Sequence, residues 1–419
     1  MAVCSQLAKQ VQGPGDYLME VCRLLWPAPA AATLSSRSQA RRVRDGSASQ
    51  LIVLPGTQAP KLVVPTGRAA SAAAIRRYGE PGSAKAKLAT RTLAGLLACG
   101  LGPVLGGRLT VTAPEGAPDI GSYLAELLGQ PVRISMHIGA ARANRKPVLQ
   151  LLTPAGETVG FAKIGMTELT SALVAAERAA LARLQAAALT KLQLPGVLAA
   201  GNWNGLDVLV LSPLPVWLRR VPLAADRLGR ALAELSQVLG TSTAPLTASD
   251  YWRDLAGRLA QAGEGAEQSA LRSSLDHLGE LAGHSGPAEL TFGCWHGDLT
   301  PWNLASTPAG LLVWDWERFA AGVPVGYDAL HYWLQSQVVD VKRDPERAAA
   351  ECADRAPELL GPFGVEPEAA RVTALAYLAD LSVRYLADRQ AEAGARLGAP
   401  GTWLLPAMKS VISSWDRSR

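Results

Sequence analysis

A polar octet followed by an acidic pair constrains this chain more than any other feature. Residues 296–303 read His-Gly-Asp-Leu-Thr-Pro-Trp-Asn, and Asp315 follows twelve residues after the asparagine, within Val-Trp-Asp-Trp-Glu. The twelve-residue spacing fits two antiparallel strands joined by a turn. The asparagine and Asp315 would then lie next to each other at the open end of a β-hairpin. We therefore expect a polar loop and a supporting hairpin within residues 290–317.

The residue types in this segment suit phosphoryl transfer. Asp298 can accept the proton of an incoming hydroxyl. Asn303 and Asp315 can bind Mg²⁺, a hard cation that prefers oxygen ligands. The alternative is that Asp298 and Asn303 only cap a turn. The complete octet, with the acidic pair at the right distance, favours the catalytic interpretation.

Length and composition bound the class of protein. A chain of 419 residues with 48% hydrophobic residues can form about two to three domains with a large core. The five cysteines form no Cys-x-x-Cys pair, so neither a zinc site nor a disulfide framework is indicated. We see no signal peptide, and the longest apolar stretch, 93–107, is shorter than the roughly twenty residues of a membrane span. A cytoplasmic protein without a membrane partner is expected.

The positive charge is concentrated near the N-terminus. The net charge of +5 divides into +7 for residues 1–130, with 14 Lys and Arg against 7 Asp and Glu, and −2 for residues 131–419, with 27 against 29. The basic clusters at 41–44 and 76–77 could contact an anionic partner. Because no aromatic residues or nucleic-acid module accompany them, we expect a solvated face and no nucleic-acid partner.

Residues 1–130 read as an N-terminal extension of unknown role that packs on the next lobe. The predicted elements are helices at 17–26, 69–78, 84–99 and 120–128, the last with Ser122 near its start, a β-hairpin at 51–65, a strand at 109–111 and a loop at 28–50. These segments are too short for an independent catalytic domain.

Residues 131–215 carry the strand-rich part of the sequence. The predicted elements are strands at 132–139, 147–152 and 158–164, a helix at 169–186 with Thr167 as its N-cap, and a strand at 208–211. Residues 216–419 are predicted to be mostly helical, apart from the hairpin.

The motif H-G-D-x-x-x-x-N, followed by apolar-D-x-E, resembles the aminoglycoside phosphotransferase and choline-kinase-like family. The resemblance covers roughly 131–340. It implies an α+β, protein-kinase-like two-lobed fold, with a small β-rich N-lobe at 131–215 and a helical C-lobe at 216–419. It also implies Mg²⁺-dependent transfer of the γ-phosphoryl group of ATP or GTP to a hydroxyl of a small molecule. The alternative is a nucleotide-binding pseudokinase that acts as an interaction or regulatory module.

A lysine and a glutamate are expected to position the nucleotide phosphates. Lys163 lies in an apolar predicted strand, where a lysine is unfavourable unless it is paired. Glu177, on the following helix, is its expected partner, whereas Glu168 fits compensation of the helix dipole better. The alternative is an exposed lysine on an edge strand.

The loop at 139–146 has one glycine, unlike the glycine-rich loop of protein kinases. The spacing of Gly139 and Asn144 is similar to that in many loops of the resembled family, so Asn144 and nearby backbone amides are expected at the nucleotide. Three cations either contact phosphates or form a solvated tip: Arg142, Arg145 and Lys146.

The resemblance implies roles for five further residues. Ser212 and Leu214 match the hinge that reads the nucleotide base through its backbone. Glu317 replaces a glycine of protein kinases and is expected to assist the metal or the substrate. His296 is expected to support the metal loop, and Asp328 to bond the backbone of the catalytic loop.

The acceptor pocket is expected beyond residue 330. Four residues at near-helical spacing either line it or form an ordinary amphipathic helix: Tyr377, Asp380, Arg384 and Tyr385. Acidic residues could attract a cationic acceptor or form a solvated face: Asp340, Asp344, Glu346, Glu351 and Asp354.

Five of the eleven tryptophans gather around the motif: Trp295, Trp302, Trp314, Trp316 and Trp333. They could form an aromatic wall for a substrate or pack in the core. Trp302, beside Asn303, is expected to narrow the acceptor cleft.

Overall fold

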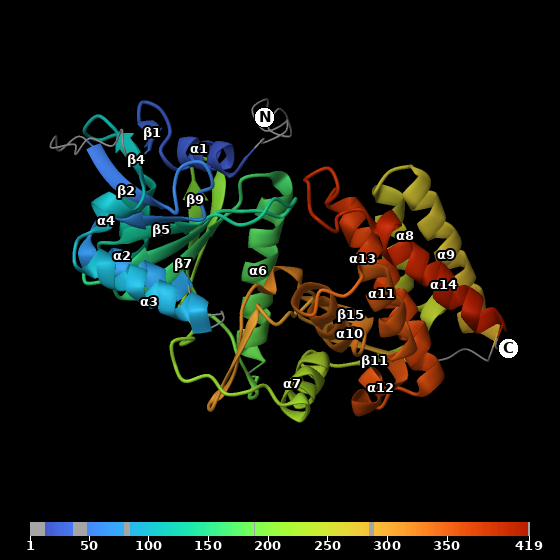
Figure 1. Cartoon of the computed structure of the whole chain (residues 1–419). Coiled ribbons are helices and arrows are strands. Elements are labelled where there is room, and N and C mark those ends of the chain that lie inside the picture. The colour runs from blue at the N-terminus through green and yellow to red at the C-terminus, as the bar shows by residue number, and fades with distance from the viewer. Residues whose placement is uncertain (1–12, 37–47, 79–83, 188, 285–288, 418–419) are drawn as a thin grey trace. The chain divides into compact units, whose positions relative to one another are not determined.

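The computed structural model describes residues 13–36, 48–78, 84–187, 189–284 and 289–417 (Figure 1). The chain divides into two compact units. Unit 1 comprises 1–140, 145–175 and 195–217, and unit 2 comprises 141–144, 176–194 and 218–419. The first is built on a large sheet and the second is mostly helical, which confirms the α+β class. The basic cluster at 41–44 lies outside the described residues.

Unit 1 is built on a nine-stranded antiparallel sheet. Its strands, in spatial order, are β1 (Ala31–Ser35), β4 (Gly107–Thr112), β2 (Ala48–Leu54), β3 (Leu62–Pro65), β5 (Arg133–His137), β6 (Val148–Leu152), β7 (Thr158–Ile164), β10 (Leu206–Leu211) and β9 (Val197–Trp203). Its helices are α1 (Pro14–Leu25), α2 (Arg68–Tyr78), α3 (Ala84–Ala98), α4 (Gly102–Leu105), α5 (Ile120–Leu128) and the start of α6 (Glu168–Ala186).

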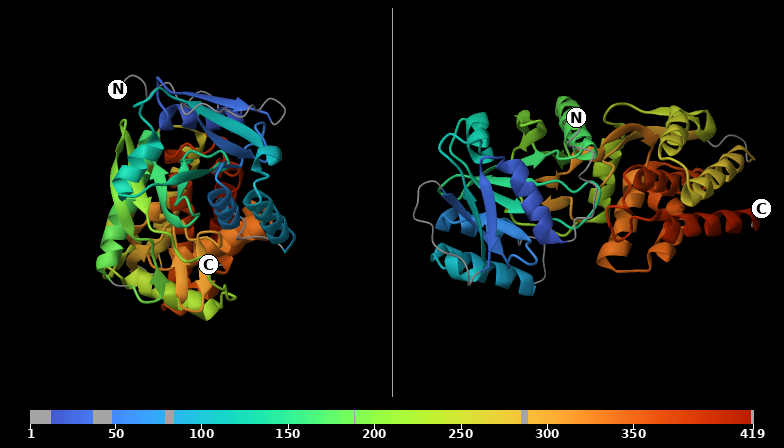
Figure 2. Two further views of the ribbon diagram at one scale, coloured as in Figure 1. Left: turned by 90° about the vertical axis from the view of Figure 1, so that its left-hand side faces the viewer. Right: turned by 90° about the horizontal axis from the view of Figure 1, so that it is seen from above.

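Helices cover both faces of this sheet (Figures 1 and 2). Successive residues of a strand point to opposite faces. Ile52 of β2 therefore packs in the cluster that includes α2 and α3, whereas Val53 packs in the cluster that includes α1 and α5. Because β3 pairs with β5, at Leu62 with His137 and Val63 with Met136, the N-terminal strands continue the sheet of the later ones.

Most strands and helices of unit 1 lie where the sequence predicts them. The hairpin at 51–65 is confirmed as β2 and β3, and the predicted strands at 132–139, 147–152, 158–164 and 208–211 as β5, β6, β7 and β10. The loop predicted at 28–50 is wrong where β1 and the start of β2 lie, because Thr33 and Ser49 pair with β4 instead of remaining in a loop.

The helix starts show which side chains serve as caps. Thr167 Oγ1 accepts from the backbone N–H of Thr170 at 3.2 Å, as expected for the N-cap of α6. In α5 the cap is Asp119 rather than Ser122. Asp119 Oδ2 accepts from Ser122 N at 2.8 Å, so the serine is the capped residue.

Unit 2 consists mainly of helices. They are α7 (Ala225–Gln237), α8 (Asp250–Gln261), α9 (Ala266–His284), α10 (Tyr327–Gln335), α11 (Pro345–Asp354), α12 (Ala356–Leu360), α13 (Pro367–Ala387) and α14 (Leu404–Arg417). The strands β11 (Ser242–Pro245), β12 (Glu289–Trp295) and β15 (Ala320–Pro324) form one small sheet. The strands β13 (Leu304–Thr307), β14 (Gly310–Val313) and β8 (Leu192–Gln193) form another.

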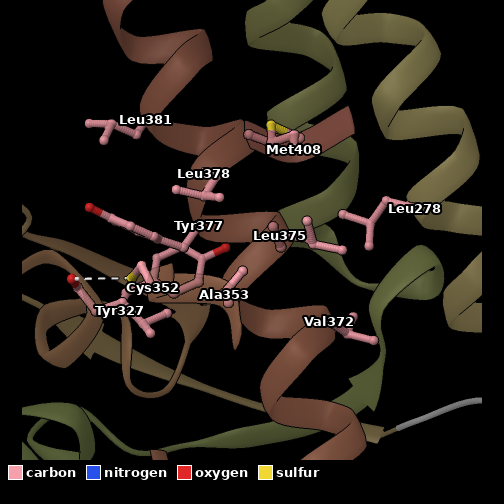
Figure 3. Packing of buried hydrophobic residues seen from close by; sticks show 14 of the residues in the cluster. Leu278, Tyr327, Cys352, Ala353, Val372, Leu375, Tyr377, Leu378, Leu381 and Met408 are labelled. Atoms are coloured by element: carbon pink, nitrogen blue, oxygen red, sulfur yellow. Dashed lines mark hydrogen bonds between the residues drawn. The ribbon is translucent and has the colours of Figure 1, made fainter. Parts of the chain in front are cut away.

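Helix α13 lies at the centre of the core of unit 2. Figure 3 shows Leu375 and Leu378 of α13 among side chains of α9, α10, α11 and α14. The same cluster includes Tyr377 and Leu381, so apolar residues lie on several sides of this helix. A helix that is apolar all round belongs in a core, and α13 can therefore hold its polar residues at fixed positions. No helix within the described residues is long and apolar enough to cross a membrane.

Candidate active site

The predicted hairpin is present as β13 and β14. Leu304 pairs with Val313 and Thr307 with Gly310. Trp314 N donates to Asn303 O at 3.1 Å, so the residue before β13 lies beside the residue after β14. This pairing brings Asn303 close to Asp315, which follows Trp314.

Both carboxylate oxygens of Asp298 have hydrogen-bond partners. Asn303 Nδ2 donates to Asp298 Oδ2 at 3.1 Å and to Asp298 O at 2.9 Å. On the other side, His331 Nε2 lies 3.3 Å from Asp298 Oδ1. The Asp298 side chain is still 39% exposed, so an incoming hydroxyl can reach it. Burial alone would raise the pKa of Asp298, but the hydrogen bond from His331 and the nearby charge of Arg384 help to hold the pKa below its usual value.

His331 is a further residue of the candidate site, and no sequence motif pointed to it. It lies on α10, three residues after Asp328, and its Nδ1 lies 2.9 Å from Tyr377 Oη. Burial lowers the pKa of His331, which favours the neutral ring. Because a carboxylate only accepts, we assign the proton to Nε2, and Nδ1 then accepts from Tyr377. The available signal was a histidine one helical turn after Asp328.

His296 joins the polar loop to the end of the hairpin. The backbone N–H of Asp298 donates to His296 Nδ1 at 3.2 Å, and His296 Nε2 lies 3.1 Å from Trp314 O. These partners require Nε2 to carry the single proton. Burial lowers the pKa of His296 to about 4, so the ring is neutral near pH 7.

Asp328 holds the backbone of the same loop. Its Oδ2 accepts from His296 N at 2.7 Å, and its Oδ1 accepts from Gly297 N at 3.3 Å. Burial raises the pKa of Asp328 to about 7. Gly297 has a φ of +85°, and a Cβ there would lie 2.1 Å from Arg318 O. Only glycine fits this position.

Three carboxylates gather beyond the hairpin. One oxygen each of Glu177, Asp315 and Glu317 lies within 4.8 Å of the others. Trp316 N donates to Glu177 Oε1 at 3.2 Å, and Asn144 Nδ2 lies 3.4 Å from Glu317 Oε1. Asp315 has a φ of +68°, a left-handed conformation uncommon outside glycine and frequent at functional sites. The set of hard oxygen donors fits a divalent cation such as Mg²⁺.

The remaining nucleotide candidates lie in unit 1. Lys163 is buried, and its strand β7 lies between β6 and β10, where Lys163 pairs with Val148 and Leu209. The edge-strand alternative is therefore wrong. Ser212 Oγ, after β10, accepts from Gly196 N at 2.7 Å, and Leu214 is buried. Since Lys163 and Glu177 belong to different units, their pairing stays a prediction.

One of the three loop cations contacts the N-terminal helix. The guanidinium carbon of Arg145 lies 3.4 Å from the centroid of the Tyr17 ring, and both residues belong to unit 1. Such stacking is a favourable cation–π geometry. The guanidinium of Arg145 therefore contributes to packing against α1.

A cavity of about 160 Å³ opens beside Asp298, entirely within unit 2. His331, Arg384 and Tyr385 line it, together with Arg142 of the 139–146 loop. Two of the four acceptor candidates on α13 therefore face the cavity. The other two candidates are buried and do not line the cavity. Tyr377 forms a hydrogen bond with His331, and Asp380 forms an ion pair with Arg258 at 3.1 Å.

The tryptophans and the acidic residues contribute little to this cavity. None of the five tryptophans lines it, and Trp295 and Trp316 are buried in the core, whereas Trp302 is 39% exposed. None of the five acidic residues between 340 and 354 lines it either. Most of these acids are exposed, and Glu351 forms an ion pair with Arg343, as expected for a solvated face.

The polar loop thus carries an oriented carboxylate beside a hairpin that leads to a carboxylate cluster, an arrangement typical of phosphotransferases with a kinase-like fold. The model of the phosphotransferase enzyme family matches residues 156–364. The match of these residues to that family confirms the resemblance drawn from the octet.

Two solved structures illustrate the wider similarity. Choline kinase LicA from Streptococcus pneumoniae is 15% identical over 70% of this chain and 98% of its own, with a TM-score of 0.45. A thermostable mutant of aminoglycoside phosphotransferase APH(4)-Ia, in complex with ADP and hygromycin B, is 16% identical over 70% of this chain and 98% of its own, with a TM-score of 0.46. No curated protein matches the chain.

Proposed function

We propose that the protein is a small-molecule kinase that transfers the γ-phosphoryl group of ATP or GTP to a hydroxyl of its acceptor, with Mg²⁺. The main support is Asp298, whose carboxylate is exposed yet oriented through both oxygens by Asn303 and His331. An oriented, ionised carboxylate at the mouth of a cavity is what a hydroxyl acceptor needs.

Asp298 acts as the base in this proposal. The acceptor hydroxyl gives its proton to Asp298, and its oxygen forms the new bond to the γ-phosphorus. The bond from the γ-phosphorus to the bridging oxygen breaks, and the nucleoside diphosphate leaves with the electron pair. Because the transition state is loose, positioning and charge neutralisation dominate. A positioned base typically contributes about 10²–10⁴-fold.

Asn303, Asp315 and Glu317 would hold the metal. The oxygen donors of Asp315 and Glu317 belong to the carboxylate cluster, and the backbone pairing of Asn303 with Trp314 places Asn303 close to Asp315. Bound Mg²⁺ would neutralise charge on the β- and γ-phosphates. Glu177 supports the Asp315 turn by accepting from Trp316 N.

Four further residues are candidates for contact with the nucleotide. Lys163 is a buried cation on a central strand, a position that suits contact with the α- and β-phosphates. Asn144 lies beside Glu317, at the metal end. Ser212 and Leu214 follow β10 and would present backbone groups to the base. His296 and Asp328 would support the loop without touching substrate.

The alternative is a pseudokinase that binds nucleotide and acts as an interaction or regulatory module. The two proposals differ in what Asp298 does. A pseudokinase has no need for a base that is both oriented and exposed. The geometry of Asp298 therefore favours a working enzyme.

Calorimetric titration of ATP and of GTP, each with and without Mg²⁺, tests the proposal on wild-type protein and on Asp315→Ala. We expect Mg²⁺-dependent binding of one nucleotide and loss of that dependence in the variant. If neither ATP nor GTP binds to the wild-type protein, the proposal is refuted. Binding of the same strength with and without Mg²⁺ would exclude the metal role of Asp315.

A further inference from the structure

The charged residues around the cavity beside Asp298 are unevenly paired. Its lining holds two carboxylates, Asp298 and Asp388, and three guanidinium groups. Asp388 is neutralised by an ion pair with Arg318. That leaves Arg142 and Arg384 against Asp298 alone, so the cavity keeps a net positive charge whenever Asp298 is ionised.

The neighbouring cavity of unit 2 does not supply the missing negative charge. It is lined by Asp254 and Asp380, but both pair with Arg258, at 2.7 Å and 3.1 Å. Its remaining carboxylates are also paired, since Asp250 bonds to Arg253 and Asp388 to Arg318. Each of these four carboxylates therefore already has a cationic partner other than Arg384, although Asp254 and Asp380 share a single one.

Arg384 forms no ion pair with a carboxylate among the described residues, although its charge acts on nearby Asp298. Its Nη1 donates to Gly297 O at 2.6 Å, and its guanidinium carbon lies 5.4 Å from the Trp295 ring centroid. Its Nε and Nη2 are buried and have no hydrogen-bond partner among the described residues. Buried donor atoms without an acceptor are costly to a fold, and an anion bound in the cavity would give these two atoms an acceptor.

Arg142, in the 139–146 loop, offers the second cation of the lining. It is exposed and forms no ion pair or hydrogen bond within the part of the chain that the structure describes. The next residue, Ala143, donates its backbone N–H to Gln390 Oε1 at 3.2 Å, and Gln390 also lines the cavity. The backbone beside Arg142 is therefore tied to the cavity wall while its guanidinium stays available.

The cavity adjoins the side of Asp298 that faces His331. Its lining includes His331, which bonds to Asp298 Oδ1, and Asn144, whose Nδ2 lies 3.4 Å from Glu317 Oε1, but not Asn303, Asp315 or Glu317. A group in this cavity can therefore present a hydroxyl to Asp298 while it adjoins the residues proposed to hold the metal.

We propose that the acceptor carries an anionic group, a carboxylate or a phosphate, that lies against Arg142 and Arg384 while its hydroxyl faces Asp298. The inference rests on the proposed kinase function, because that function makes the occupant of the cavity an acceptor. It disfavours cationic acceptors, which two unpaired guanidinium groups would repel.

Matched acceptors that differ only in charge test this inference. The probes are D-glycerate, glycerol and 3-amino-1,2-propanediol, with D-gluconate, D-glucitol and D-glucamine as a longer set. Formation of the nucleoside diphosphate in the presence of Mg²⁺ and ATP or GTP gives kcat/KM for each. Tryptophan fluorescence gives binding of each probe without nucleotide.

The variants are Arg142→Gln and Arg142→Glu, which change an exposed side chain and spare the fold. Arg272→Gln, an exposed arginine of α9 outside the cavity, is the matched control. We expect the anionic member of a set to exceed the cationic one by at least about tenfold in kcat/KM. Arg142→Gln should remove most of that preference by raising KM for the anion, and the control should keep it.

Three outcomes would overturn the inference. In the first, the neutral or cationic probes are phosphorylated as well as the anionic probe or better. In the second, Arg142→Gln raises KM for the nucleotide instead of KM for the acceptor, and in the third, wild type and Arg142→Glu show the same preference for the anion. If no probe is phosphorylated, the binding measurement decides: saturable binding of an anion that Arg142→Gln weakens supports the inference, and its absence overturns it. Failure of Mg²⁺-nucleotide binding refutes the kinase proposal separately.

Discussion

His331 Nε2 lies 3.3 Å from Asp298 Oδ1, and Asn303 Nδ2 lies 3.1 Å from Asp298 Oδ2, so the proposed base is held from both sides. His331 is itself fixed by Tyr377, 2.9 Å from its Nδ1. This chain of contacts connects the core helix α13 to the reacting carboxylate. A base that is already oriented loses no further orientational freedom in the transition state.

The first prediction concerns His331 as a positioning residue. His331→Leu should lower kcat by about tenfold to a hundredfold, the loss expected for one hydrogen bond to a charged group. KM for the nucleotide should stay unchanged. His331→Gln, whose amide can still reach Asp298, should recover much of the loss. Equal impairment of both variants, with raised KM values, would show that the histidine only supports the fold.

The second prediction concerns the base. Asp298→Asn keeps the shape of the side chain but cannot take the acceptor proton. We expect turnover to fall by about 10²–10⁴-fold, with nucleotide affinity within a few-fold of wild type. Steady-state kinetics and calorimetry on the same preparation separate the two effects. Turnover close to that of wild type would remove Asp298 from the role of base.

The third prediction concerns Lys163. Lys163→Ala should weaken Mg²⁺-nucleotide binding by about tenfold or more, because it removes a buried cation opposite the phosphates. Lys61→Ala, at an exposed lysine of the same unit, is the control. Calorimetry measures both. Unchanged affinity in Lys163→Ala would move the phosphate contact to another residue.

The sequence was sufficient to predict the spatial arrangement of those candidate residues that lie close together in the chain. Asp298, Asn303 and Asp315 lie within eighteen residues, and the pairing of β13 with β14 brings them together. Lys163 was also predictable as a buried residue, since its strand is apolar on both sides. In these cases short-range spacing determines the geometry.

The other parts of the cavity depend on packing between distant helices. His331 is on α10 and Arg384 on α13, and their approach to the loop follows from burial of α13, which no local motif encodes. Strand β9 was missed because its Leu-Ala-Ala-Gly-Asn segment has weak β-propensity. It forms because pairing with β10 outweighs that preference.

The fourth prediction concerns the N-terminal residues. Leu109 of β4 is fully buried in the same cluster as Leu149 of β6 and Val208 of β10. Leu109→Ala should therefore lower the free energy of unfolding of the whole of unit 1 by about 2–5 kcal/mol. Leu88→Ala, at a residue that is 67% exposed, should change it by less than about 0.5 kcal/mol.

Urea unfolding with and without nucleotide is the measurement. If residues 1–130 were an independent domain, Leu109→Ala would give a separate early transition and leave the stabilisation by nucleotide intact. A single shifted transition is expected instead, because β3 pairs directly with β5.

The fifth prediction concerns pH and His296. The pKa of a histidine is about 6.5 in an unfolded chain, and burial lowers that of His296 to about 4. Between these values the unfolded state binds more protons, so this residue makes the free energy of unfolding rise with pH from about 4 to 6.5. Asp328 acts oppositely, because burial raises its pKa to about 7 and the folded state then binds more protons over much of the same range.

In wild type, His296 and Asp328 change the free energy of unfolding in opposite directions as pH rises, so variants are needed to separate the two contributions. The stability difference between wild type and His296→Gln should grow with pH by up to about 3 kcal/mol between pH 4 and 6.5, and stay constant above. The difference between wild type and Asp328→Asn should instead shrink as pH rises toward 7. Chemical denaturation of the three proteins across this range is the measurement. A difference for His296→Gln that does not vary with pH would mean that His296 is not held neutral in the folded protein.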